Sequence, residues 1–239
     1  MWWEMKCYKD MIYWSGLVLL SAVLWMIIGQ PESLNDIYQG IPFCSKPLGY
    51  MQHISVYLAY IWSCMGFMEP YLRQGGIYRL VRKKKKQCFL FQVHGQLFLH
   101  LCRLEILRWM IYSICFFLKK RSVIQFDAYQ FFAEAAIHFA VLYVFCLLQI
   151  LLEIWSSENV SFGMMWLIDL GGLFAGDFLY SNKLPLDRVI VLLNNLTMKL
   201  RIQETGISNG AVMTVSVLGI GILTVIFYIT IKKRDFLKI

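Results

Sequence analysis

Ionisable side chains inside long apolar stretches are the residues of this sequence that could do chemistry. Asp169 and Asp177 are eight positions apart, about two helical turns, so one helix would carry both on nearly the same face. Glu105 and Arg108 have the i, i+3 spacing at which opposite charges pair on a helix. Charged groups inside a membrane-spanning helix often belong to an ion or proton pathway. A candidate intramembrane polar site therefore comprises the following residues: Glu105, Arg108, Glu134, His138, Asp169 and Asp177.

A structural role competes with this interpretation, and we favour it for the two aspartates. Asp177 would then lie at the outer membrane interface, and Asp169 would pair with a neighbour inside the helix bundle. The four histidines are scattered, so each is expected to pack in the bundle or at the interface rather than to bind a ligand.

Residues 88–118 allow two arrangements, because they are too long for one straight crossing and contain Arg103, Glu105 and Arg108. The charges could lie at the membrane interface, so that only residues 104–118 cross, or they could be buried inside the bundle. We expect the interfacial arrangement because it costs less free energy.

Motifs for enzymatic chemistry are missing from the sequence. It contains no GxxxxGK[ST] phosphate loop, no HExxH zinc motif and no GxSxG nucleophile turn. Its seven cysteines form no CxxC pair and no zinc spacing. We therefore expect a chain that is not an enzyme and that binds neither a metal ion nor a cofactor of its own.

The composition indicates a membrane protein, because 59% of the 239 residues are hydrophobic and only 16% are charged. Soluble domains are typically about a quarter charged, so this chain has too little polar surface to coat a globule of its size. We expect an all-α polytopic membrane protein of the plasma membrane, with one transmembrane domain over residues 1–239 and six transmembrane helices. The predicted spans are 11–28, 51–68, 104–118 with an interfacial lead-in at 88–103, 131–152, 161–180 and 211–231.

The first apolar stretch could instead be a cleaved signal peptide, because basic residues precede it. It continues into the bulky residues Trp25 and Met26 rather than into a small-residue cleavage site, so we favour a retained span.

Three further segments have recognisable patterns. Gln30–Gly49 is rich in turn-forming residues and is expected to be an exposed loop, with a short helix opened by Ser33. Asp187–Gln203 is predicted to be an amphipathic helix before the last span. Gly172 and Gly176 form a small-xxx-small pair, which allows helix backbones to approach closely in lipid.

The most basic segment is Tyr71–Gln87, which holds seven of the 23 lysines and arginines and no acidic residue. Ile77, Leu80 and Val81 share one helical face there, which predicts a short amphipathic helix; a disordered basic connector is the alternative. Basic residues cluster at the ends of apolar stretches, which suits an anionic inner leaflet better than nucleic acid. With six spans, the excess of Lys and Arg on the side of this segment places both termini in the cytoplasm.

The sequence resembles the small permease subunits of ABC type-2 exporters, in particular those of bacteriocin and lantibiotic export and immunity. The resemblance rests on six spans in 239 residues, on GGIYRLVRKKKKQCF after the second span, on the polar stretch before the last span and on the final KKRDFL. In that family the basic segment holds a coupling helix seated on the ATPase. Ile77-Tyr78, Arg82, Lys83–Lys86 and Phe89 match its pattern of an aliphatic-aromatic pair, an arginine, a basic cluster and an aromatic.

The resemblance implies a permease that moves a peptide or another amphipathic substrate, with ATP and magnesium bound by a separate ABC ATPase. It implies a second permease subunit, in a homodimer or a heterodimer, a lipid bilayer and no nucleic acid as partners. The coupling residues would be Leu72, Arg73, Ile77, Tyr78, Arg79, Leu80, Arg82, Lys83 and Lys85.

Two other functions are compatible with the sequence. A non-transporting membrane scaffold, or an immunity or accessory subunit, could bind anionic lipid through the basic segment. An intramembrane enzyme or ion carrier using Asp169, Asp177, Glu134 and His138 is a weaker alternative.

Overall fold

The computed structural model describes residues 2–29, 31–69, 86–119, 126–184 and 193–233. Within these ranges the chain is helical and contains seven α-helices. Their bounds are α1 (Trp2–Leu24), α2 (Pro47–Cys64), α5 (Lys86–Lys119), α6 (Ala128–Trp155), α7 (Glu158–Ser181), α8 (Lys199–Thr205) and α9 (Asn209–Lys233). Three short segments accompany them: a π-helical turn η1 (Trp25–Gly29) and the 3₁₀ helices η2 (Leu34–Tyr38) and η4 (Leu193–Thr197).

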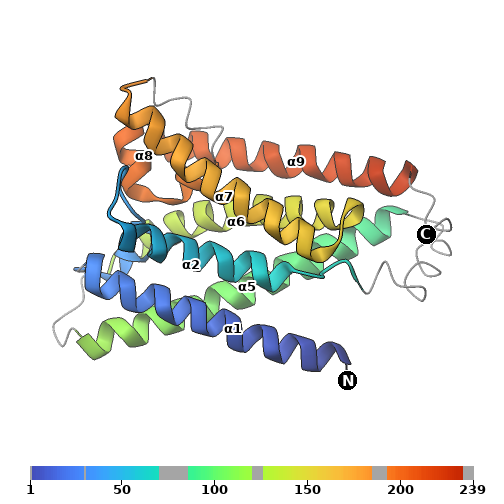
Figure 1. Cartoon of the computed structure of the whole chain (residues 1–239), viewed down its shortest axis with the longest axis horizontal. Coiled ribbons are helices and arrows are strands. Elements are labelled where there is room, and N and C mark those ends of the chain that lie inside the picture. The colour runs from blue at the N-terminus through green and yellow to red at the C-terminus, as the bar shows by residue number, and fades with distance from the viewer. Residues whose placement is uncertain (1, 30, 70–85, 120–125, 185–192, 234–239) are drawn as a thin grey trace.

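The six long helices lie side by side and alternate in direction (Figure 1). We name the two ends of the bundle by what they contain. The termini end holds the beginnings of α1, α5 and α7 and the ends of α2, α6 and α9. The loop end holds η2, η4 and α8. The coupling residues 72–85 of the predicted basic segment lie outside the described residues.

Four of these helices are long and apolar enough to cross a membrane, which makes this a multi-pass membrane protein by length and composition. The four are Ile12–Gly29, Ala128–Trp155, Glu158–Ser181 and Asn209–Lys232. The other two long helices, α2 and α5, run beside them, and spans for these two stay predictions. At 1.5 Å per residue the 34 residues of α5 extend about 51 Å, which exceeds the roughly 30 Å of a hydrocarbon core. The predicted lead-in and crossing are thus one continuous helix.

Helix α6 is the centre of the bundle and packs against α2, α5, α7 and α9. Of the residues in its apolar span 78% are buried, whereas only 28% of those in the span of α7 and 17% of those in the span of α9 are buried. Large apolar side chains of α9 such as Leu218 and Ile222 are exposed, 59% and 60% respectively. An apolar outer face of this kind is what lipid or another apolar helix would cover.

The segment between α1 and α2 differs from the prediction, because it is packed into the bundle rather than exposed. Ile37, Tyr38 and Ile41 are nearly fully buried. The short helix predicted after Ser33 is present as η2, and the Asp36 carboxylate accepts a hydrogen bond from the Ser33 backbone N–H at 3.0 Å. The apolar residues spaced between the turn formers explain the burial, since η2 packs against α5 and α6 and Ile41 packs with Leu173 and Met198.

The predicted helix over residues 187–203 is only partly present where the structure describes it, because it is not continuous. Its described part is η4 followed by α8, with Met198 in extended conformation between them. Asn194 and Asn195 explain the break, because their amides bond to carbonyl groups of α7. Gly172 and Gly176 permit that approach, and what lies against them is the two asparagine side chains rather than another helix backbone.

Candidate functional site

The first candidate site is the α5–α6 cluster, formed by Glu105, Arg108 and His138. Their side chains meet inside the bundle and are at most 5% exposed. His138 Nδ1 is 2.9 Å and Arg108 Nη1 is 3.4 Å from Glu105 Oε1. With its proton on Nδ1, His138 donates to Glu105, and its Nε2 accepts from Arg108 Nη1 at 3.0 Å. The interfacial arrangement that we expected for these charges is therefore wrong for Glu105 and Arg108, whereas Arg103 is exposed.

Aromatic and backbone groups complete the surroundings of this cluster. The Tyr38 hydroxyl donates to Glu105 Oε2 at 3.4 Å, and Arg108 Nη2 donates to the carbonyl of Ile37 at 3.5 Å. The guanidinium carbon of Arg108 is 5.2 Å from the ring centroid of Tyr38 and 5.3 Å from that of Tyr112. Burial, and then the charge of Glu105, raise the pKa of Tyr38 well above its ordinary value, so this hydroxyl remains a donor. Paired and bonded in this way, the two charges can be buried, which explains why they need not lie at an interface.

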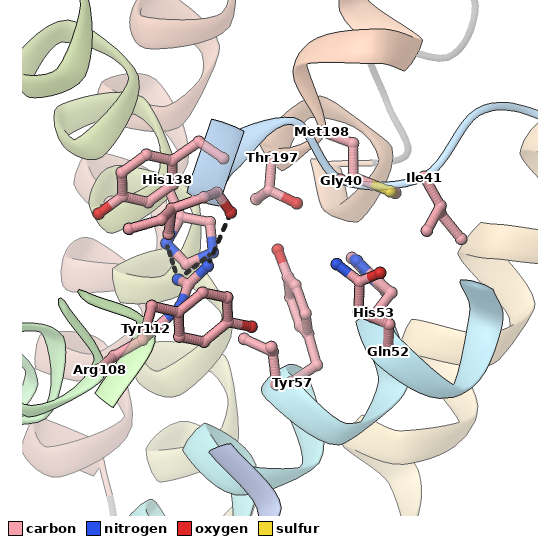
Figure 2. A pocket seen from close by; sticks show the side chains of 13 residues that line it. Gly40, Ile41, Gln52, His53, Tyr57, Arg108, Tyr112, His138, Thr197 and Met198 are labelled. Carbon is pink, nitrogen blue, oxygen red and sulfur yellow. Dashed lines mark hydrogen bonds between the residues drawn. The ribbon is translucent and has the colours of Figure 1, made fainter. Parts of the chain in front are cut away.

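A small inner cavity of about 30 Å³ adjoins the cluster (Figure 2). Gln52, His53 and Tyr57 of α2 point into it from one side, and Arg108 and His138 line it from another. This volume accommodates about one or two water molecules, so it is too small for an organic substrate.

His53 connects the inner cavity to helix α7. Its Nε2 is 3.8 Å from Asp169 Oδ1 and accepts or donates no hydrogen bond among the described residues. Asp169 is fully buried, and the amide of Asn194 donates to its carbonyl at 2.7 Å and to its Oδ1 at 3.2 Å. His53, Arg108 and His138 therefore line one water-sized space, with Asp169 next to His53 and Glu105 bonded to His138.

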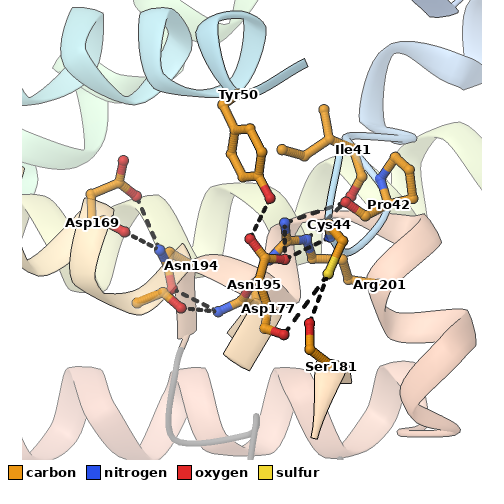
Figure 3. Close-up of polar contacts among 11 residues, drawn as sticks. Ile41, Pro42, Cys44, Tyr50, Asp169, Asp177, Ser181, Asn194, Asn195 and Arg201 are labelled. Carbon is orange, nitrogen blue, oxygen red and sulfur yellow. Dashed lines mark hydrogen bonds and ion pairs between the residues drawn. The ribbon is translucent and has the colours of Figure 1, made fainter. Parts of the chain in front are cut away.

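The second candidate site is the α7–α8 cluster around Asp177 and Arg201 (Figure 3). Arg201 is fully buried, and its Nη2 lies 3.0 Å from Asp177 Oδ1. Its Nε donates to the carbonyl of Ile41 at 3.2 Å, and Asn195 accepts from its Nη1. Burial lowers the pKa of Arg201, and the nearby Asp177 carboxylate opposes that shift.

Among the residues that the structure describes, three groups donate to the Asp177 carboxylate. Besides Arg201, the backbone N–H of Cys44 donates to its Oδ1 at 2.9 Å, and the Tyr50 hydroxyl donates to its Oδ2. The carboxylate thus joins α7 to α8, to α2 and to the segment before α2. A carboxylate held this completely positions helices and has little capacity left for a ligand.

The structure brings three of the six predicted site residues together, namely Glu105, Arg108 and His138. The two aspartates lie on one face of α7 and contact the same segment, residues 194–201. Glu134 stands apart and pairs with Lys199, whose Nζ is 2.8 Å from Glu134 Oε1.

The sequence reasoning did not identify Tyr38, His53, Lys199 and Arg201 as parts of these sites. Lys199 and Arg201 lie in the stretch predicted to be an amphipathic helix, where a basic residue is ordinarily solvated. A pattern within one helix carries no signal for partners that lie on another helix. Among the residues that the structure describes, no three His, Cys, Asp or Glu side chains are grouped to hold a metal ion.

A family model described as "Protein of unknown function (DUF2705)" matches residues 13–237. The chain belongs to this family. Comparisons with curated proteins and with solved structures give no match. In this DUF2705 protein the matched range includes both clusters and nearly all of the six long helices, so the sites described above belong to the part that defines the family.

Proposed function

We propose that this DUF2705 protein is the membrane-embedded permease subunit of an ATP-driven ABC exporter, with ATP hydrolysis on a separate subunit. The observation that carries the proposal is the alternation of the six long helices, which places the end of α2, the start of α5 and both terminal helix ends together (Figure 1). The basic segment joins α2 to α5 and so begins and ends at the termini end. A positively charged connection there suits a cytoplasmic docking surface.

Helix α5 would carry the motion of the ATPase into the bundle. It begins at Lys86, directly after the basic segment, and continues without interruption to Lys119. Glu105 and Arg108 lie near its middle and bind His138 of α6. A displacement of the start of α5 therefore moves a buried ion pair that is bonded to the central helix, rather than a freely sliding apolar surface.

The transported molecule would pass between two permease subunits rather than through one. The inner cavity holds only one or two waters, and the charged groups around it are largely paired. The outward apolar faces of α7 and α9 offer a surface for a second subunit, identical or different. A route between the apolar faces of two subunits would suit a peptide or another amphipathic molecule.

A non-transporting scaffold or accessory subunit is the second candidate, and the packed interior favours it. A bundle filled by paired side chains needs no transport role, and its basic segment could hold anionic lipid instead.

The first test is whether a neighbouring reading frame encodes a Walker-motif ATPase, and the second is co-purification of this chain with that ATPase. The variant Ile77→Ala/Leu80→Ala/Arg82→Ala removes two apolar side chains and one charge from the predicted coupling helix. Its matched control, Leu48→Ala/Met51→Ala/Lys46→Ala, removes the same kinds of group from exposed positions at the loop end. We expect the first variant to insert in the membrane and lose the ATPase, and the control to retain it. Retention of the ATPase by both variants would favour the scaffold.

A further inference from the structure

A second cavity, of about 260 Å³, lies at the loop end between the first turns of α6 and helix α8. We call it the loop-end cavity. Tyr38, Ile137 and Glu134 line it together with Lys199, and Tyr129, Gln203 and Asn209 are exposed at its rim. The exposed rim makes the cavity accessible from outside the bundle.

Glu134 is the acidic residue among the lining side chains, and its bonding is incomplete. It is only 9% exposed. Its Oε1 accepts from Lys199 Nζ at 2.8 Å and from Gln130 Nε2 at 2.9 Å. Its Oε2 is buried and accepts no hydrogen bond from any described residue. An ionised carboxylate has about four acceptor positions, so this one has capacity for a further donor.

We propose that the loop-end cavity binds a primary ammonium or guanidinium group, with Glu134 as its counter-ion. Three features of the cavity suit a cation of this kind. The carboxylate has a free acceptor, the exposed ring of Tyr129 provides a face that attracts cations, and the amides of Gln203 and Asn209 can accept hydrogen bonds. The volume lies just below the 300–1,000 Å³ range of pockets for drug-sized ligands, so it fits a head group of side-chain size.

The ammonium group of Lys199 pairs with Glu134 as the ammonium group of the ligand would. Lys199 already occupies one oxygen of Glu134, and its side chain is 26% exposed, so it can swing toward solvent when another cation enters. Competition with Lys199 lowers the affinity for an external cation. Removal of this lysine charge should therefore strengthen binding, whereas removal of the Glu134 charge should weaken it.

Isothermal titration calorimetry on the full-length protein in detergent micelles tests the site, and it needs neither the ATPase nor transport. The probes are n-butylammonium for a free amine and N-acetyl-lysine methylamide for a peptide side chain, with butyrate and butyramide as anionic and neutral controls. The variants are Glu134→Gln, Lys199→Met and, as a matched control, Glu32→Gln, which changes an exposed carboxylate in the segment between α1 and α2. Thermal unfolding of each variant verifies that it is folded.

We expect at least one cationic probe to bind, Glu134→Gln to weaken it about tenfold to a hundredfold, and Lys199→Met to strengthen it. Glu32→Gln should leave the affinity unchanged. Binding of the capped lysine alone would assign a peptide side chain as the ligand, and equal binding of both probes would assign any small amine. Absence of binding by both cations, equal binding of butyrate, or equal loss in Glu134→Gln and Glu32→Gln would overturn the proposal. None of these results depends on whether the protein is a permease.

Discussion

Replacement of Arg201 by methionine tests whether the α7–α8 cluster holds the loop end together. Methionine keeps the length and apolar character of the side chain but removes every hydrogen bond of the guanidinium. Asp177 then keeps a buried charge with two donors, the Cys44 backbone N–H at 2.9 Å and the Tyr50 hydroxyl. The carbonyls of Ile41 and Pro42 also lose their donors.

The expected loss of unfolding free energy follows from these lost and remaining hydrogen bonds. Removal of one partner from a buried ion pair typically costs about 3–5 kcal/mol. Because Asp177 keeps two donors, we expect Arg201→Met to lower the free energy of unfolding by about 3 kcal/mol, the lower end of this range. For a chain of this size, about 2–4 °C of melting temperature corresponds to 1 kcal/mol, so the apparent Tm should fall by about 6–12 °C.

The assay is thermal unfolding in detergent, followed by circular dichroism and tryptophan fluorescence. The matched control is Lys199→Met, on the same short helix; because the Lys199 side chain is 26% exposed and that of Arg201 is fully buried, its loss should cost less than that of Arg201. The double variant Arg201→Met/Asp177→Asn removes both charges, so its loss should be smaller than the sum of the single losses by about 1–3 kcal/mol. A shift below about 2 °C for Arg201→Met, or strict additivity in the double variant, would refute the reasoning.

Two further predictions each compare two residues of the same type, first two cysteines and then two glycines. Cys44 is exposed at the loop end, and Cys88 is exposed at the termini end. In variants that retain one of these two cysteines, a membrane-impermeant maleimide should label Cys44 in intact cells and Cys88 only after permeabilisation. Labelling in the opposite sense would invert the topology and remove the basis of the exporter proposal. Gly176→Ala should lower the free energy of unfolding by about 1–3 kcal/mol, because the new Cβ would lie 2.6 Å from Asn195 Oδ1. Gly171→Ala, whose Cβ would meet nothing within 4 Å, should be neutral or slightly stabilising, and equal losses in the two variants would contradict the packing argument.

The helices themselves could be predicted from local signals. Long apolar stretches predicted α6, α7 and α9, because a helix in lipid satisfies all of its backbone hydrogen bonds within one segment. Asp169 and Asp177 share a face of α7 because of the helical period alone. Such properties depend on neighbours within one element, which the order of residues specifies directly.

Tertiary partners could not be predicted in the same way. Arg201 looked like a solvated residue of an amphipathic helix, and its burial depends on carbonyls of Ile41 and Pro42, 159 or 160 positions earlier. Glu105 and Arg108 were expected at an interface because a lone charge in a bundle is costly. The expectation failed because His138 and Tyr38, from other elements, lower that cost. The basic segment that suggested coupling lies outside the described residues, so its structure stays a prediction.

Tyr38 lines both the inner cavity and the loop-end cavity, and its hydroxyl reaches Glu105. Tyr38 therefore contacts two separate spaces, one beside the buried α5–α6 cluster and one beside Glu134. A different position of the Tyr38 side chain would therefore alter both spaces and its hydrogen bond to Glu105 at once. The two cavities are thus coupled through one side chain and are not structurally independent.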